Sequence, residues 1–232
     1  MRLPVAILAG GLATRLRPLT EKIPKALVEL NGEPFIAHQL RLLRNAGIKE
    51  VVICAWYRGE LLQEFIGDGH QFGMDVHYSF DGDTPLGTGG AIQKALSVLG
   101  TDFFVLYGDS YLPCDYQAVE TAYFTSGQKG LMTVYHNLNQ GDSSNVEFLN
   151  GRILVYDKQN RSEKMEYIDY GLGVLNASIF TPYPLGKSLD LAEIYQNLLR
   201  DGDLAGYEAK ERFYEIGSFK GINELESLLK QK

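Results

Sequence analysis

Short apolar segments alternate with segments of helical periodicity through the first half of this chain. Strands are expected at 5–8, 26–30, 50–55, 74–80 and 102–107, and helices at 34–46, 60–66 and 89–99. The first strand, Val5-Ala6-Ile7-Leu8, is apolar along its whole length, as is typical of a strand buried on both faces of a parallel sheet. Alternation of this kind is produced by βαβ units. The pattern therefore predicts an α/β fold with a mostly parallel central sheet flanked by helices.

From about residue 130 the pattern shifts toward strands. They are expected at 131–136, 146–149, 152–156, 172–175 and 204–207, with helices at 189–200 and 224–230. The dipeptide Asn150-Gly151 joins two of these strands and is a strong signal for a hairpin turn. We therefore expect some antiparallel pairing, which makes the sheet mixed, and a small β-rich lobe in the second half.

The composition is that of an ordinary globular protein, with 232 residues, 45% of them hydrophobic and 22% charged. Pro4 interrupts the only stretch that could begin a signal peptide, and no apolar run approaches the length of a membrane span. We expect a cytoplasmic protein with no membrane partner. The formal net charge of −7 argues against a nucleic-acid partner, because binding a phosphate backbone requires a basic face. The sequence is compatible with a homo-oligomer and does not determine its size.

The two cysteines and four histidines lack the spacing of a metal site or a nucleophile–base arrangement. Cys54 lies in an expected strand and Cys114 follows a proline. We expect both thiols to be reduced and structural, and the histidines to be structural as well.

A glycine pair and a cluster of cations follow the first strand. Gly10 and Gly11 come directly after it, and Arg15, Arg17, Lys22 and Lys25 supply four cations within eleven residues, against one acid, Glu21. Open α/β sheets bind ligands at the carboxyl ends of their strands. A glycine backbone can adopt positive φ and turn its N–H groups toward phosphate oxygens. The segment therefore predicts a polyphosphate site, and it matches neither the dinucleotide fingerprint nor the P-loop.

The order of residues in this segment is more specific than its composition. G-G-x-A-T-R-L-x-P-L-T at 10–20, P-K-A-L at 24–27 and P-L-G-T-G-G-A at 85–91 resemble the signature of the sugar-1-phosphate nucleotidyltransferases, or nucleotide-sugar pyrophosphorylases. The resemblance implies a Rossmann-like nucleotidyltransferase fold in one domain, 1–232, with a nucleotide-binding half at 1–129 and a sugar-side half at 130–232. It also implies two substrates, an NTP and a sugar 1-phosphate, which give an NDP-sugar and pyrophosphate with Mg²⁺ as cofactor.

Several functions within and outside this family are compatible with the sequence. The short length and the segment at 85–91 are most similar to heptose-1-phosphate guanylyltransferases. Muramate-1-phosphate uridylyltransferases and phosphocholine cytidylyltransferases are the alternatives, and the latter would need an aromatic cage, for which Tyr156, Tyr167 and Tyr170 are candidates. A catalytically silent, nucleotide-sugar-binding regulatory subunit is the non-enzyme alternative. Such a subunit would be expected to lack Arg15, Lys25 or Asp109, and all three are present.

The chemistry implied by the resemblance needs cations and no general base. A sugar 1-phosphate has a second pKa of about 6 and is already ionised at neutral pH. The difficulty is the approach of an anion to the NTP tetra-anion, so positive charge and in-line geometry are what the site must supply. Arg15 is expected to hold the β- and γ-phosphates through its planar fork of donors, and Lys25 to lie between the α-phosphate and the incoming sugar phosphate.

The resemblance assigns the remaining site residues by position. Asp109 is implied as the first Mg²⁺ ligand. Glu215, in Tyr214-Glu215-Ile216-Gly217, occupies the place of the aspartate in the usual Asp-x-Gly, with one more methylene. The expected nucleotide-binding residues are Leu8, Ala9, Gly10, Gly11, Thr14, Arg15, Gly87, Thr88 and Gly89, with Gly87 and Thr88 nearest the base. The expected sugar-binding residues are Asn145, Asp157, Lys158, Asp169 and Gly171. Ser143-Ser144 stands where relatives commonly have Tyr-Gly, which leaves the sugar open.

Overall fold

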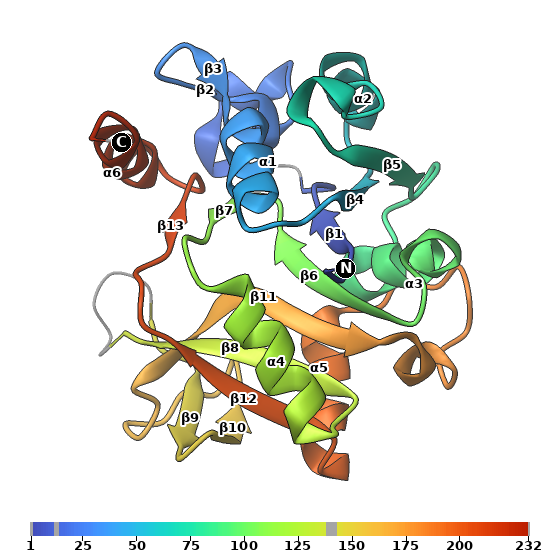
Figure 1. The fold of residues 1–232 in the computed structure, drawn as a ribbon, viewed down its shortest axis with the longest axis vertical. Coiled ribbons are helices and arrows are strands. Elements are labelled where there is room, and N and C mark those ends of the chain that lie inside the picture. The colour runs from blue at the N-terminus through green and yellow to red at the C-terminus, as the bar shows by residue number, and fades with distance from the viewer. Residues whose placement is uncertain (1, 12–13, 138–142, 232) are drawn as a thin grey trace.

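A nine-stranded mixed sheet forms the centre of the protein. The computed structural model describes residues 2–11, 14–137 and 143–231 (Figure 1). The main path through the sheet runs β10-β9-β11-β6-β1-β4-β5, and β8 and β12 extend it beside β11. The strands are β1 (Val5–Leu8), β4 (Glu50–Ala55), β5 (Asp75–Phe80), β6 (Asp102–Tyr107), β8 (Gly130–His136), β9 (Val146–Leu149), β10 (Arg152–Tyr156), β11 (Tyr167–Asn176) and β12 (Leu204–Ala209).

Strands β5, β4, β1 and β6 pair parallel in that order, and β12 pairs parallel with β8. β11 then pairs antiparallel with β6 on its other side, and the β9–β10 hairpin turns at Asn150-Gly151, where both residues have positive φ. The expected α/β fold with a mixed, mostly parallel sheet flanked by helices is confirmed.

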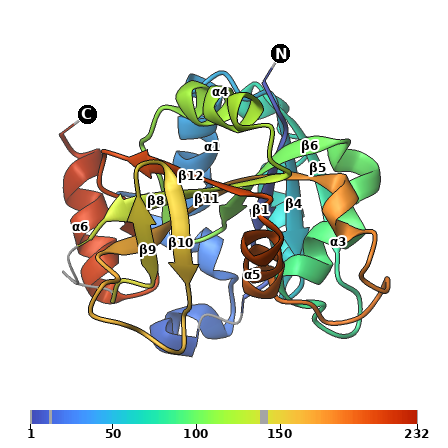
Figure 2. The same ribbon diagram turned by 90° about the horizontal axis from the view of Figure 1, so that it is seen from below.

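Helices cover both faces of the sheet (Figure 2). Their bounds are α1 (Phe35–Asn45), α2 (Gly59–Ile66), α3 (Gly87–Leu99), α4 (Tyr116–Ser126), α5 (Leu191–Asp201) and α6 (Phe219–Leu229). Alternate residues of a strand point to opposite faces, so Val5 and Ile7 pack with α1, α2 and α4, whereas Ala6 packs with α3 and α5. None of the helices in the described part of the chain is long and apolar enough to cross a membrane.

A third apolar cluster joins the beginning and the end of the chain. Leu16 and Leu30 pack there with Ile216, Ile222 and Leu225 of the C-terminal segment. In the same region the short strand β13 (Tyr214–Glu215) pairs antiparallel with β7 (Ser110–Tyr111). This pairing brings the C-terminal segment beside Asp109, the second residue after β6.

Several expected elements differ in the structure. The segment expected as a strand at 26–30 begins instead as a 3₁₀ helix, Lys25–Leu27. Leu27 N donates to Pro24 O there, and Val28 N donates to Lys25 O. Only β2 (Glu29–Leu30) is extended, and it pairs with β3 (Glu33–Pro34). The helix expected at 89–99 begins at Gly87, and the last helix begins at Phe219 rather than 224.

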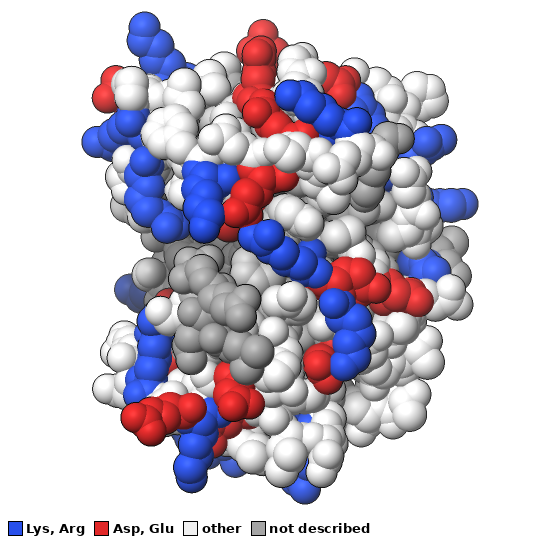
Figure 3. Space-filling model, turned by 90° about the vertical axis from the view of Figure 1, so that its left-hand side faces the viewer, with Lys and Arg blue, Asp and Glu red and all other residues white. Residues whose placement is uncertain are grey.

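Charged side chains of both signs are interspersed over the face that carries α6 (Figure 3). No continuous basic area of the kind that follows a nucleic-acid backbone is seen among the described residues on this face.

Candidate active site

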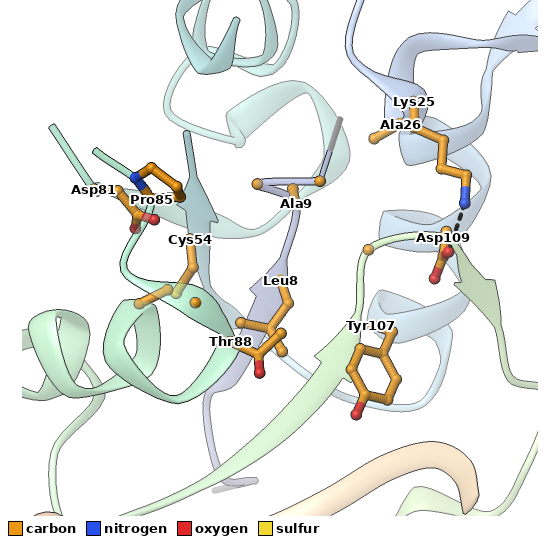
Figure 4. Close-up of a pocket in the computed structure, with 15 residues that line it drawn as sticks. Leu8, Ala9, Lys25, Ala26, Cys54, Asp81, Pro85, Thr88, Tyr107 and Asp109 are labelled. Carbon is orange, nitrogen blue, oxygen red and sulfur yellow. Dashed lines mark hydrogen bonds and ion pairs between the residues drawn. The ribbon is translucent and has the colours of Figure 1, made fainter. Parts of the chain in front are cut away.

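A cavity of about 320 Å³ opens at the carboxyl ends of the parallel strands. Its lining comes from the ends of β1, β4 and β6, from the 3₁₀ helix that begins at Lys25, and from the connection between β5 and α3 (Figure 4). This is the place where open α/β sheets bind ligands. The lining residues are Leu8, Ala9, Gly10, Gly11, Lys25, Ala26, Cys54, Asp81, Pro85, Gly87, Thr88, Ala91, Tyr107, Gly108 and Asp109.

An ion pair lies at one side of this cavity. Lys25 Nζ donates to Asp109 Oδ2 at 2.7 Å, and the Lys25 side chain is only 15% exposed (Figure 4). The two residues are 84 positions apart in the chain, so the fold, not local sequence, brings them together. The result is a fixed cation beside a carboxylate at the edge of a space lined by glycine.

The two glycines after β1 keep space free of side chains, and they do not adopt a left-handed backbone conformation. Neither Gly10 nor Gly11 has positive φ, which corrects the conformation expected from the sequence. A Cβ on Gly11 would meet no atom within 4 Å, and one on Gly10 would lie 3.4 Å from Trp56. Both positions could therefore hold a side chain in this structure, and the absence of one keeps the cavity open beside Lys25. Two residues of the motif, Leu12 and Ala13, lie outside the described residues.

The second glycine-rich segment is shaped by packing against the chain before α5. Gly87 has φ +73°, and a Cβ there would lie 2.6 Å from Leu189 O. Gly89 N donates to Leu189 O at 2.8 Å, and Thr88 Oγ1 donates to Asp190 Oδ1 at 3.1 Å and accepts from Leu191 N at 2.8 Å. Gly87 and Thr88 line the cavity as expected, but the hydroxyl of Thr88 already has partners at the start of α5.

The turn that carries Asp109 is held close to β1. A Cβ on Gly108 would lie 2.6 Å from Leu8 O, and Gly108 N donates to that same oxygen at 3.0 Å. From the other side, Ile216 N donates to Asp109 O at 2.9 Å. The backbone of the Asp109 turn is thus held between the end of β1 and the C-terminal segment.

Arg15, Thr14 and Glu215 lie outside the cavity lining. Arg15 and Thr14 are exposed, in the 3₁₀ helix Thr14–Leu16. Glu215 accepts from Gly217 N and, at 3.0 Å, from Ser218 Oγ. A Cβ on Gly217 would lie 3.0 Å from Arg15 Nη2 and would also collide with the Glu215 carboxylate. The structure therefore brings Arg15 and Glu215 to the same glycine, next to the Asp109 turn.

Four of the five expected sugar-binding residues lie together next to Tyr107: Asn145, Lys158, Asp169 and Gly171. Asp169 N donates to Asn145 Oδ1 at 2.9 Å, Gly171 N donates to Asp169 Oδ1 at 3.0 Å, and Lys158 Nζ lies 3.7 Å from Asp169 Oδ2. Lys158 Nζ also lies 5.4 Å from the centre of the Tyr107 ring, and Tyr107 lines the cavity.

Asp157 is the exception. Its carboxylate accepts from Gln159 N and Asn160 N, and these bonds lower its pKa. The side chain therefore closes its own turn, and Asp157 joins the group through its backbone alone, because Asp157 N donates to Asn145 O at 3.0 Å.

Asp81 is a lining residue that sequence reasoning missed. It follows β5 directly, and Leu86 N donates to its Oδ2 at 2.8 Å. Burial raises the pKa of this carboxyl, against the lowering effects of the Leu86 hydrogen bond and Lys94. Its Oδ1 has no hydrogen-bond partner among the described residues. An acid at the end of a buried strand, just before a glycine-rich helix start, was the signal that could have identified it.

Of the two thiols, Cys54 is buried and Cys114 is partly buried. Cys54 lines the cavity beside Asp81, and burial with the nearby Asp81 charge raises its pKa to about 12. Neither Cys54 nor Cys114 forms a disulfide.

The carboxylates near the cavity fit a hard divalent cation whose remaining ligands come from the substrate. No group of three His, Cys, Asp or Glu side chains that could hold a metal occurs within residues 2–11, 14–137 and 143–231. Mg²⁺ is commonly held by one or two carboxylates together with substrate phosphates and water. Asp109 at the cavity edge, with Glu215 brought near by the β7–β13 pairing, is compatible with that mode.

Together, the open sheet, the glycine-lined cavity and its ion pair define a protein of the nucleotide-binding α/β class. The chain belongs to the nucleotidyl transferase family, whose model matches residues 5–232.

Relatives and solved structures agree with this assignment. The chain is 31% identical over 232 residues to a mannose-1-phosphate guanyltransferase of Neurospora crassa, covering 92% of this chain and 60% of that protein. It is 28% identical over 191 residues to a D-glycero-alpha-D-manno-heptose 1-phosphate guanylyltransferase of Campylobacter jejuni, covering 82% and 83% of the two chains. The chain thus spans only about 60% of the length of the Neurospora relative.

Among solved structures, HddC from Yersinia pseudotuberculosis in complex with GMP-PN has a TM-score of 0.79 at 21% identity, covering 98% of this chain and 100% of the other. A UDP-glucose pyrophosphorylase from Acinetobacter baumanii has a TM-score of 0.75 at 20% identity, covering 97% and 92%. At these identities the likeness establishes the fold.

Proposed function

We propose that this protein transfers a guanylyl group from GTP to a sugar 1-phosphate, producing a GDP-sugar and pyrophosphate. The observation that carries the proposal is the Lys25–Asp109 pair at the edge of the glycine-lined cavity. A nucleophile that is already anionic needs neutralisation of charge rather than a base. In the part of the chain that the structure describes, a cation and a carboxylate lie together there, and no histidine lines the cavity.

Each charged residue has a distinct role in this proposal. Lys25 lies where its ammonium stabilises the α-phosphate and the incoming sugar phosphate, and Arg15 closes over the β- and γ-phosphates from the exposed loop. Asp109 and Glu215 are the proposed ligands of Mg²⁺, which when bound neutralises charge on the phosphates of the NTP. The Gly10-Gly11 loop leaves the phosphates room to approach the chain.

Asp81 supports guanine as the base. It lies across the cavity from Lys25 and Asp109, about where the base of a nucleotide held by its phosphates would end (Figure 4). Guanine presents two adjacent donors, N1–H and the 2-amino group, to one carboxylate. Adenine and cytosine place an acceptor beside their amino donor, and uracil has one N–H between two carbonyls. Both relatives described above are named as guanyl- or guanylyltransferases.

The cluster around Asp169 is the proposed sugar site. The Asp169 side chain is 6% exposed and orders Gly171, the Tyr156 hydroxyl and Lys158, and the Lys158 side chain is 43% exposed, so the cluster presents an ordered ammonium to sugar hydroxyls. The printed names of both relatives contain mannose or manno-heptose, and we propose a manno-configured heptose or hexose 1-phosphate as substrate.

The phosphocholine alternative is less compatible with the structure. Tyr156 packs in the apolar cluster on one face of the sheet and Tyr170 in the cluster on the other face. The three candidate tyrosines therefore do not converge on one cationic ligand.

Thermal shift with Mg²⁺ and each NTP tests the choice of base, because a ligand that binds only the native state raises apparent stability. We expect GTP to give the largest rise in Tm for the wild-type protein. In Asp81→Asn, an amide replaces one acceptor by a donor, so the preference for GTP over ATP should fall by about tenfold or more. Equal shifts with all four NTPs, or an unchanged preference in Asp81→Asn, would reject guanine recognition by this residue.

A further inference from the structure

We propose that Gln39 is a positioning residue that holds the Asp109 turn in place. Gln39 lies on α1 and is completely buried, although it is polar. Its Nε2 donates to Tyr107 O at 3.2 Å and to Ser110 O at 2.7 Å. These two carbonyls flank Gly108-Asp109, so one amide group bridges the base of the turn that carries the carboxylate.

Three elements of the fold form hydrogen bonds to the Asp109 turn, and Gln39 provides the bonds from α1. Gly108 N is bonded to Leu8 O of β1, and Asp109 O accepts from Ile216 N of the C-terminal segment. The Gln39 side chain provides two N–H donors from one nitrogen, which matches two carbonyls that must be served together. The position of the Asp109 turn is therefore fixed from β1, from the C-terminal segment and from α1.

The other atom of the amide indicates why glutamine is present. Gln39 Oε1 is buried and has no hydrogen-bond partner among the residues that the structure describes. Turning the amide over would place this oxygen against two carbonyl oxygens, so the observed orientation is the favourable one. Leaving one polar atom unsatisfied in the core costs free energy, and the two hydrogen bonds that Nε2 donates to the turn offset that cost.

The consequence concerns the distance between Asp109 and Lys25. This step rests on the proposed function, in which both side chains act on the phosphates and the metal. When the bridge is lost, the turn gains freedom, and Asp109 leaves its position 2.7 Å from Lys25 for part of the time. Misplacement of a reacting or charged group by about 1 Å is enough to slow a reaction that depends on positioning.

Gln93 provides a matched control. It is a buried glutamine on α3 whose Nε2 also donates to two backbone carbonyls, those of Phe180 and Tyr183, at 3.3 and 2.8 Å. It lies outside the cavity lining. Gln39→Met and Gln93→Met each keep the length of the side chain, and each removes two hydrogen bonds from a side-chain amide to backbone carbonyls. The two variants should therefore lower Tm by similar amounts.

Hydrogen exchange and kinetics of these two variants test the proposal. In Gln39→Met, amides of 107–111 should exchange about tenfold faster, kcat should fall about tenfold, and the Mg²⁺ concentration for half-maximal rate should rise. In Gln93→Met all three should stay within about twofold of wild type. Unchanged exchange at 107–111 in Gln39→Met overturns the inference whether or not the protein has the proposed activity. A faster exchange without any loss of activity overturns the role in positioning Asp109.

Gln39→Glu gives a second readout that does not depend on the methionine variant folding. An ionised carboxylate at this place repels both carbonyls, whereas the protonated acid can donate one hydrogen bond, and burial favours the protonated form. The activity of Gln39→Glu relative to wild type should therefore be several-fold higher at about pH 6 than at about pH 8. A ratio that does not change with pH would contradict the bridging role.

Discussion

Replacement of Lys25 by alanine tests the ion pair that organises the candidate site. The ammonium lies 2.7 Å from Asp109 Oδ2, with the two side chains 15% and 34% exposed. The exposure of Asp109 means that solvent screens part of their attraction, so the main loss is expected in the transition state rather than in folding. Removing one preorganised donor from a charge-stabilising site costs about 3 kcal/mol, and each 1.36 kcal/mol is about a factor of ten. We therefore expect kcat of Lys25→Ala to fall by about 10²-fold.

Release of pyrophosphate from GTP and a sugar 1-phosphate, followed at saturating Mg²⁺, is the assay. Lys129→Ala is the control, because Lys129 forms an equally short ion pair with Asp203, at 2.6 Å, on the surface away from the cavity. Its rate should remain within about twofold of wild type. If Lys25→Ala keeps its melting temperature and also its rate, the role of Lys25 as the cation between two phosphates is refuted.

Two further outcomes follow from the geometry. Glu215→Gln should raise the Mg²⁺ concentration required for half-maximal activity by about tenfold, because a neutral amide is a poorer ligand for a hard cation; an unchanged Mg²⁺ titration would remove Glu215 from the metal site. The pKa values of Cys54 and Cys114 are raised by burial to about 12, so both thiols stay protonated well above neutral pH. Treatment of the native protein with iodoacetamide at about pH 8 should leave both unmodified by mass spectrometry, and rapid alkylation of either would contradict that burial.

Much of the fold follows from local pattern in the sequence. The strands at 50–55, 102–107, 146–149 and 152–156 have the bounds expected from their apolar runs and from the Asn-Gly turn. Helix α4 was not expected, because its buried face is made of Tyr116, Val119 and Tyr123 and its polar residues are not segregated clearly. Its start does carry a signal, since Asp115 accepts from Gln117 N and Ala118 N as an N-cap.

The candidate site was only partly predictable, because its contacts are long-range. The motif around Lys25 and the Gly108-Asp109 turn indicated the residues, but their pairing depends on strand order. Both Gly87 and Gly89 were expected to face a ligand; Gly87 lines the cavity, Gly89 does not, and close packing against Leu189 leaves no room for a side chain at either position. Asp157 matched the family position, yet its own turn occupies its carboxylate. Gln39 carries no sequence signal, because only the fold shows which carbonyls it reaches.

The central claim is that this site joins GTP to a sugar 1-phosphate with loss of pyrophosphate. The most direct measurement is ³¹P NMR of the protein with GTP, Mg²⁺ and a manno-configured sugar 1-phosphate. The account predicts equal amounts of pyrophosphate and a GDP-sugar diester, formed only when all three are present. If GTP binds by thermal shift but no pyrophosphate appears with any sugar 1-phosphate, the protein is a nucleotide-binding subunit without this activity, and the account is contradicted.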